Sequence, residues 1–142
     1  MKVRKGISAL IALVMMISCC TFAQASDIEL MASEQIMYCS ASAYTGSRSG
    51  QIDIEFRVLA NGTMKTIGAS KIAIYKSNGQ YVTTIYGSVS NGFLATSKST
   101  YGYTYTYPGV SGTSYYAVVT VYAYDGSGSD SQEIKTNTVR AS

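Results

Sequence analysis

Few side chains in this sequence could perform acid–base or nucleophilic chemistry, because its 142 residues include no histidine. The missing imidazole excludes Ser-His-Asp and Cys-His catalytic arrangements and histidine metal sites. Asp53 and Glu55 lie close together in the chain and could form a carboxylate pair of the glycosidase kind. Arg57 follows at the same spacing, which favours ordinary surface charges. We therefore predict no catalytic residue and no enzyme activity, and a secreted hydrolase is the weakest alternative.

A second group of oxygen-bearing side chains lies in the glycine-rich segment 125–130. Asp125 and Asp130 flank serines and glycines there, and calcium binds oxygens of this kind. The spacing is not that of an EF-hand loop, and the composition is typical of a flexible hairpin turn. Cys39 has no imidazole partner and is expected to be a small buried apolar side chain. The sequence predicts neither a metal nor a cofactor.

The tyrosines could form a surface that binds a carbohydrate or a peptide, because a tyrosine ring is large, stiff and amphipathic. A row of them alternates with glycine and threonine over 101–107, which favours an inward-facing row in the core over an exposed platform. A second set lies on the face of its strand opposite Val119 and Val121, and an open face there would be a candidate ligand-binding site. The row comprises Tyr101, Tyr103, Tyr105 and Tyr107, and the candidate site comprises Tyr116, Tyr122 and Tyr124.

The strands that must position these side chains are predicted from periodicity. The run of β-branched and aromatic residues over 115–124 contains no glycine, proline or charge, which predicts a central strand. Residues 51–59 alternate apolar and polar side chains, which is typical of a strand with one buried face. Weaker patterns predict further strands over 36–44, 70–76, 80–86, 100–107 and 132–139.

Turn residues separate these predicted strands. Asn61-Gly62, Ser77-Asn78-Gly79 and Asn91-Gly92 are the clearest turns. The chain's only proline, Pro108, is expected to lie outside the sheet. About seven short strands with such turns predict an all-β, antiparallel two-sheet sandwich. A small closed barrel is the alternative that periodicity leaves open.

The first 25 residues have the parts of a secretory signal peptide, ending in the cleavage motif Ala23-Gln24-Ala25. The alternatives are an uncut membrane anchor and a lipid anchor on Cys19. We expect a flexible lead-in over 26–35 and the sandwich domain over 36–142. The net charge of +3 comes entirely from the signal, so the remainder is neutral and is not expected to bind nucleic acid or a membrane surface.

The segment 109–116 and the strand after it resemble the E–F corner and F strand of fibronectin type III domains. The resemblance implies a fibronectin III-like or immunoglobulin-like sandwich with a corner tyrosine that hydrogen-bonds to backbone, either Tyr115 or Tyr116. Most of the chain after the signal also resembles a group of small secreted proteins of Gram-positive gut anaerobes, which implies export and fold without an activity. That second resemblance is carried by segments 67–75, 77–79, 114–120 and 128–131.

These patterns predict a secreted, non-enzymatic β-sandwich protein that binds or adheres to a surface glycan, polymer or protein outside the cell. The alternative is a structural, self-assembling component of an extracellular matrix that pairs through its edge strands. Either function has an extracellular partner, and neither requires a membrane once the signal is removed.

Overall fold

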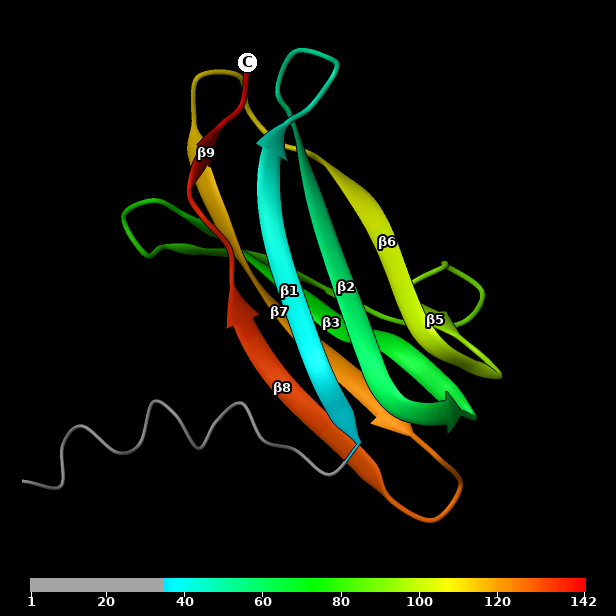
Figure 1. Ribbon diagram of the computed structural model, residues 1–142. Helices are drawn as coiled ribbons and strands as arrows, with labels where there is room; N and C mark the ends of the chain where they lie inside the picture. Colours follow the sequence, from blue (N-terminus) through cyan, green and yellow to red (C-terminus); the bar gives the residue numbers. More distant parts are fainter. Residues whose placement is uncertain (1–34) are drawn as a thin grey trace, which may run out of the picture. The chain divides into compact units, whose positions relative to one another are not determined.

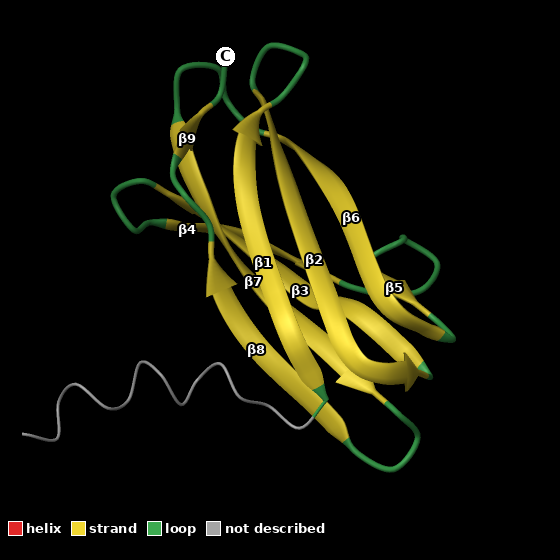
Figure 2. Ribbon diagram, in the orientation of Figure 1, coloured by secondary structure: helices red, strands yellow, loops and turns green. Residues whose placement is uncertain are grey.

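The structure, a computed structural model, describes residues 35–142 and contains no helix in that part of the chain (Figure 2). No segment of the described residues is a helix that could span a membrane. The predictions of a signal over 1–25, of a lipid anchor on Cys19 and of a lead-in up to residue 34 lie outside the described residues. The strands are β1 (Ile36–Thr45), β2 (Gln51–Met64), β3 (Thr66–Lys76), β4 (Tyr81–Tyr86), β5 (Leu94–Ala95), β6 (Lys98–Pro108), β7 (Ser114–Tyr124), β8 (Ser129–Lys135) and β9 (Val139–Arg140).

The strands form two antiparallel sheets that are stacked as the layers of a sandwich (Figure 1). The three-stranded sheet has the order β1-β2-β6. The six-stranded sheet has the order β4-β3-β7-β8, with β5 paired to β3 and β9 paired to β7. Because no strand pairing joins the two sheets among the described residues, the closed-barrel alternative is wrong. The predicted all-β sandwich is confirmed, and the two strands beyond the expected seven are the two-residue β5 and β9.

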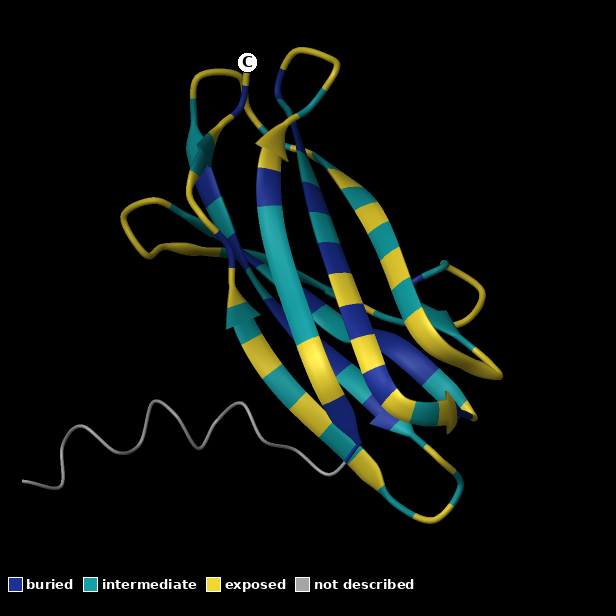
Figure 3. Cartoon of the chain, in the orientation of Figure 1, coloured by how far each residue is buried: buried dark blue, intermediate teal, exposed yellow. Residues whose placement is uncertain are grey.

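The core lies between the sheets and is filled by the alternate residues that the periodicity marks. In β2, Ile52, Ile54 and Phe56 are fully buried and alternate with half-buried or exposed polar residues. In β7, Val119 and Val121 are fully buried, and β7 pairs with β3 on one side and β8 on the other, so its central position is confirmed. Period-two alternation thus gives each sheet one interior face and one outer face (Figure 3).

The predicted turn at Asn61-Gly62 is wrong. β2 continues through it to Met64, and the side chains of Ala60 and Met64 are both buried. The pairing of β2 with β6 shifts register between Leu59 and Met64, so an irregularity of the strand replaces the turn. A local turn signal is therefore overridden by burial of the apolar side chains on either side of it.

Two further boundaries differ from the prediction. Pro108 is the last residue of β6, opposite Gln51, instead of lying outside the sheet. The position suits proline because β6 is an edge strand and ends there. The last predicted strand is divided at Thr136, whose buried hydroxyl accepts a hydrogen bond from the N–H of Ala117 (2.9 Å). The chain then resumes as β9.

The two edge strands of the three-stranded sheet differ in whether other residues cover their outer side. Along β1, the side-chain amide of Asn137 accepts a hydrogen bond from the N–H of Ala43 and donates one to its carbonyl (2.8 and 2.9 Å). The hydroxyl of Thr45 donates to the carbonyl of Arg140 (3.1 Å). In the described part of the chain, β6 pairs with β2 alone. One edge is therefore covered by the C-terminal segment, and the other is free.

Candidate functional site

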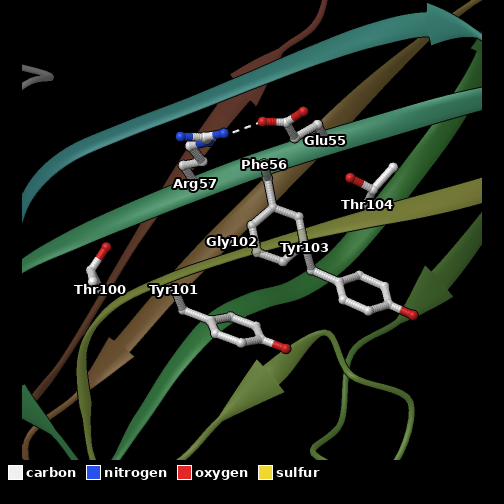
Figure 4. Close-up of a pocket in the computed structure, with 8 residues that line it drawn as sticks. All are labelled: Glu55, Phe56, Arg57, Thr100, Tyr101, Gly102, Tyr103 and Thr104. Carbon is white, nitrogen blue, oxygen red and sulfur yellow. Dashed lines mark hydrogen bonds and ion pairs between the residues drawn. The ribbon is translucent and has the colours of Figure 1, made fainter.

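A shallow hollow of about 490 Å³ lies on the three-stranded sheet over β2 and β6. Gly102 of β6 pairs with Arg57 of β2 and has no side chain, so the surface dips there. Figure 4 shows the side chains of Glu55 and Arg57 on one side of the sheet and the rings of the lining on the other. The lining comprises Glu55, Phe56, Arg57, Thr100, Tyr101, Gly102, Tyr103 and Thr104.

The charged groups beside this hollow bind one another. Nε of Arg57 lies 2.9 Å from Oε1 of Glu55, and their side chains are 71% and 33% exposed. Asp53, on the same face, accepts a hydrogen bond from the hydroxyl of Thr106 (2.6 Å). An exposed ion pair contributes only about 0–1 kcal/mol, because water and salt screen it. The structure thus places Asp53 and Glu55 on an open sheet face as surface charges.

The glycine-rich segment between β7 and β8 is a hairpin turn, as predicted. Oδ1 of Asp125 accepts hydrogen bonds from the N–H groups of Gly128 (2.9 Å) and Ser127 (2.7 Å), which lower the pKa of this carboxyl below its ordinary value. Asp130 instead accepts a hydrogen bond from the N–H of Gln35 (3.2 Å). The two carboxylates thus accept hydrogen bonds from different backbone N–H groups. Across residues 35–142 there is no cluster of three or more potential metal ligands.

Cys39 of β1 is half-buried and packs against the core. Its thiol donates a hydrogen bond to Oε1 of Gln132 on β8 (3.2 Å). Burial, and to a smaller extent the charge of Asp130, raise the pKa of the Cys39 thiol above its ordinary value. A thiol that stays protonated is a weak nucleophile, so this geometry fits a structural role.

The tyrosine row of β6 faces the interior, as predicted. All four rings are half-buried and pack on the core. The ring centroid of Tyr103 lies 6.5 Å from that of Phe56, and the hydroxyl of Tyr101 donates to the carbonyl of Gly92 (2.5 Å). Burial raises the pKa of Tyr105. The row therefore belongs to the core and offers no exposed platform.

The three tyrosines predicted as a ligand site, Tyr116, Tyr122 and Tyr124, lie on the outer face of the six-stranded sheet but do not form one group. All three are half-buried. Tyr116 lies near the start of β7, beside Tyr75 of β3, and Tyr122 is about 20 Å further along the extended strand. Tyr124 donates its hydroxyl to the carbonyl of Gly126 in the adjacent turn (3.1 Å). Only Tyr116 therefore belongs to a larger aromatic assembly.

That assembly is a row of rings across β4, β3 and β7, which we call the outer tyrosine row: Tyr81, Tyr75 and Tyr116. Tyr75 and Tyr116 are stacked, with centroids 5.2 Å apart and an interplanar angle of 9°. Tyr81 meets Tyr75 edge-on at 5.7 Å. At the other end, Nζ of Lys135 on β8 lies 4.2 Å from the ring centroid of Tyr116. The row and Lys135 together thus span four strands of the sheet.

Sequence reasoning identified Tyr116 and missed Tyr75, Tyr81 and Lys135. The predicted β3–β4 hairpin contained a usable signal, because its turn brings Tyr75 opposite Tyr81. The partners of Tyr116 carried no such signal. They depend on the register of β7 with β3 and β8, and local patterns do not specify the pairing of strands far apart in the chain.

The fold defines the class of this protein as a two-sheet antiparallel β-sandwich. No protein-family model and no curated protein matches the sequence. Among solved structures, the chain is similar to a family 76 glycoside hydrolase from a bovine Bacteroides thetaiotaomicron strain, with a TM-score of 0.41 and 18% identity over 75% of this chain. It is also similar to the apo structure of Bacteroides uniformis β-glucuronidase 3, with a TM-score of 0.38 and 12% identity over 75% of this chain. It covers 20% and 12% of those two chains.

Proposed function

We propose that this protein is a secreted, non-enzymatic β-sandwich that binds a glycan, polymer or protein outside the cell through the outer face of its six-stranded sheet. The observation that carries the proposal is the outer tyrosine row with Lys135 at its end. Tyrosine combines an apolar ring with a polar hydroxyl and loses little conformational entropy on binding, so it is frequent at recognition surfaces. The core lies on the opposite face of these strands and does not use these rings.

The most accessible rings of this face are those of β4. Tyr75 and Tyr116 are stacked on each other, and Lys135 lies over Tyr116. Tyr81 and Tyr86, by contrast, are 56% and 73% exposed on the same face of β4. A sugar ring or a ligand side chain would therefore pack against the β4 rings, and Lys135 would attract an acidic group at the other end.

We also propose that the sandwich is of the fibronectin III-like or immunoglobulin-like kind. Tyr115 supports this, because it is buried and its hydroxyl accepts a hydrogen bond from the N–H of Val110 (3.0 Å). That bond is the one expected of a corner tyrosine. A side chain at Gly109 would meet the same ring, since an added Cβ there would lie 2.8 Å from it. Of the two candidates for the corner, Tyr115 fits and Tyr116 faces outward.

A glycan array, and pull-downs with surface polymers and proteins, test the binding proposal on residues 26–142. The core lies within residues 36–141 of this part. We expect Tyr81→Ala and Tyr116→Ala each to weaken binding about tenfold or more. Tyr44→Ala is the matched control, because Tyr44 is 51% exposed on β1 of the other sheet. Binding that Tyr44→Ala abolishes and the other two leave intact would refute this choice of face.

Export is part of the proposal, and the pattern of residues 1–25 supports it. N-terminal sequencing of the protein recovered from the medium should begin at Ser26. Lipid anchoring through Cys19 is the alternative, and it would leave the protein in the cell-surface fraction with Cys19 as its first residue.

A second candidate function is a structural, self-assembling extracellular component. The observation that favours it is the free edge of β6, because an unpaired strand edge is a template for another strand.

A further inference from the structure

We propose that the free edge of β6 pairs with the β6 edge of a second copy of this chain, forming an antiparallel, two-fold symmetric dimer. The inference rests on the second candidate function and is independent of ligand binding at the outer tyrosine row. In the described part of the chain, β6 pairs with β2 alone, so the backbone N–H and C=O groups on its other side have no strand partner. Such groups bind an additional strand through main-chain hydrogen bonds.

The other sheet edges carry features that discourage pairing. The backbone of Ala43 on β1 is occupied by the amide of Asn137. β4 has only six residues and an irregular register with β3, and the seven-residue β8 carries Glu133 and Lys135. Short strands, bulges and charges all protect edges from association. β6 has eleven residues, keeps an unbroken register with β2 over 100–108, and has no charge there.

The sequence of β6 is complementary to itself. Over 100–107 its inward residues are all tyrosine and its outward residues are threonine or glycine. Any antiparallel pairing within this stretch that places tyrosine opposite tyrosine therefore places each threonine or glycine opposite another threonine or glycine, with no like charges in contact. Aromatic pairs and threonine pairs across strands are both favourable. A second copy of the chain has the same alternation because its sequence is identical. A two-fold symmetric contact is complete in a dimer and does not continue into a longer assembly.

β6 has no second strand partner among residues 35–142, and its outer face carries small side chains. Thr100, Gly102 and Thr104 are exposed on its outer face and are all small. Figure 1 shows β6 at the side of the sandwich, away from β1. Pairing there would join two three-stranded sheets into one continuous sheet, and the outer face of the six-stranded sheet would stay free for a ligand.

Sedimentation equilibrium of residues 26–142 tests the proposal, with the wild type expected to be a reversible dimer at about 100 µM. Thr104 is exposed and is the midpoint of 100–108, so in a dimer centred on this stretch Thr104→Lys and Thr104→Glu each bring like charges close together across the two-fold axis. Each should raise the dissociation constant about tenfold or more. An equimolar mixture of the two variants should restore the dimer, which a folding defect would prevent. Ser131→Lys, at an exposed position of β8, is the matched control and should leave the dimer intact.

Three results would overturn the inference. They are a wild type that is monomeric at about 100 µM, a dimer that persists in both Thr104 variants, and a dimer that is lost in Ser131→Lys. Ligand binding by the Tyr81 and Tyr116 variants is measured separately on the same preparations. Failure of the dimer therefore leaves the binding proposal standing, and failure of binding leaves the dimer standing.

Discussion

The tyrosine row of β6 and the outer tyrosine row place the same side chain in opposite settings. The first runs along one strand, where Tyr103 and Tyr105 pack against Phe93 in the core. The second runs across strands, where Tyr75 and Tyr116 stack on the outer face of the sheet. The inward row follows from alternation within one strand, whereas the outer row follows from the register between strands. Periodicity therefore identifies the tyrosines that fold the domain, and register creates the surface that we propose as a binding site.

The largest difference between the rows should be in stability. Tyr103→Ala removes a ring that contacts Phe56 and Phe93, and it should lower the free energy of unfolding by about 3 kcal/mol. The same truncation at Tyr75, on the outer face, should cost about 1 kcal/mol or less. Urea melts followed by circular dichroism measure both values. Equal losses would mean that the two rows do not differ as described.

The two faces of β7 allow a narrower comparison. Val119 is fully buried, so Val119→Ala should cost about 1–3 kcal/mol of unfolding free energy. Val118 lies next to it on the outer face and is half-buried, so Val118→Ala is the matched control and should cost about 1 kcal/mol or less. A loss of only a few tenths for Val119→Ala in the same melts would contradict a central position for β7.

The corner tyrosine tests the contribution of a single hydroxyl. Tyr115→Phe keeps the buried ring and removes the acceptor for the N–H of Val110, so it should cost about 1 kcal/mol. Tyr122→Phe is the control, because the hydroxyl of Tyr122 has no hydrogen bond within the described chain. Thermal melts of the two variants should separate. Coincident melts would show that the corner bond contributes nothing measurable.

The charged end of the outer tyrosine row should contribute least. Lys135→Gln removes the cation over the ring of Tyr116 and should lower stability by about 0.5 kcal/mol, because this exposed position is largely solvated. Lys98→Gln, at an exposed position at the start of β6, serves as the control for the loss of a positive charge. A gain in stability in Lys135→Gln would argue against a favourable cation–ring contact.

At neutral pH the titration of Tyr105 and Tyr107 should not affect stability, but in alkali it should. Burial raises the pKa of Tyr105, and burial together with the neighbouring Tyr115 and Tyr105 raises that of Tyr107, above the ordinary value of 10.0. Below that value both the folded and unfolded states hold these protons. Above it the unfolded chain ionises first, so stability should fall with rising pH. Tyr105→Phe should reduce this fall in urea melts carried out across that pH range.

Much of the fold follows from patterns within single strands. The alternation of β2, the apolar run of β7 and the turn at Ser77-Asn78-Gly79 each specify local structure, and burial selects the inward face. The Asn61-Gly62 signal failed because a local turn preference competes weakly with burial of Met64. The choice between Tyr115 and Tyr116 depends on which of the two shares the face of the buried valines.

The candidate site was less predictable than the fold. Tyr116 could be selected as an outward residue of β7, but Lys135 reaches its ring only because β8 pairs with β7 in one particular register. Nothing in the local sequence of β8 specifies that register, since neither of its two faces is clearly more apolar than the other. Contacts across strands are therefore the part of the site that local sequence patterns leave undetermined.

One amide covers part of the edge of β1. Asn137 engages both backbone groups of Ala43 as another strand would, and the chain reaches this residue only after every other long strand has been made. During synthesis, the edge of β1 therefore stays unpaired until the C-terminal residues have been made. A chain stopped before Asn137 should therefore aggregate through β1, even though every strand of its hydrophobic interior except the short β9 would be present.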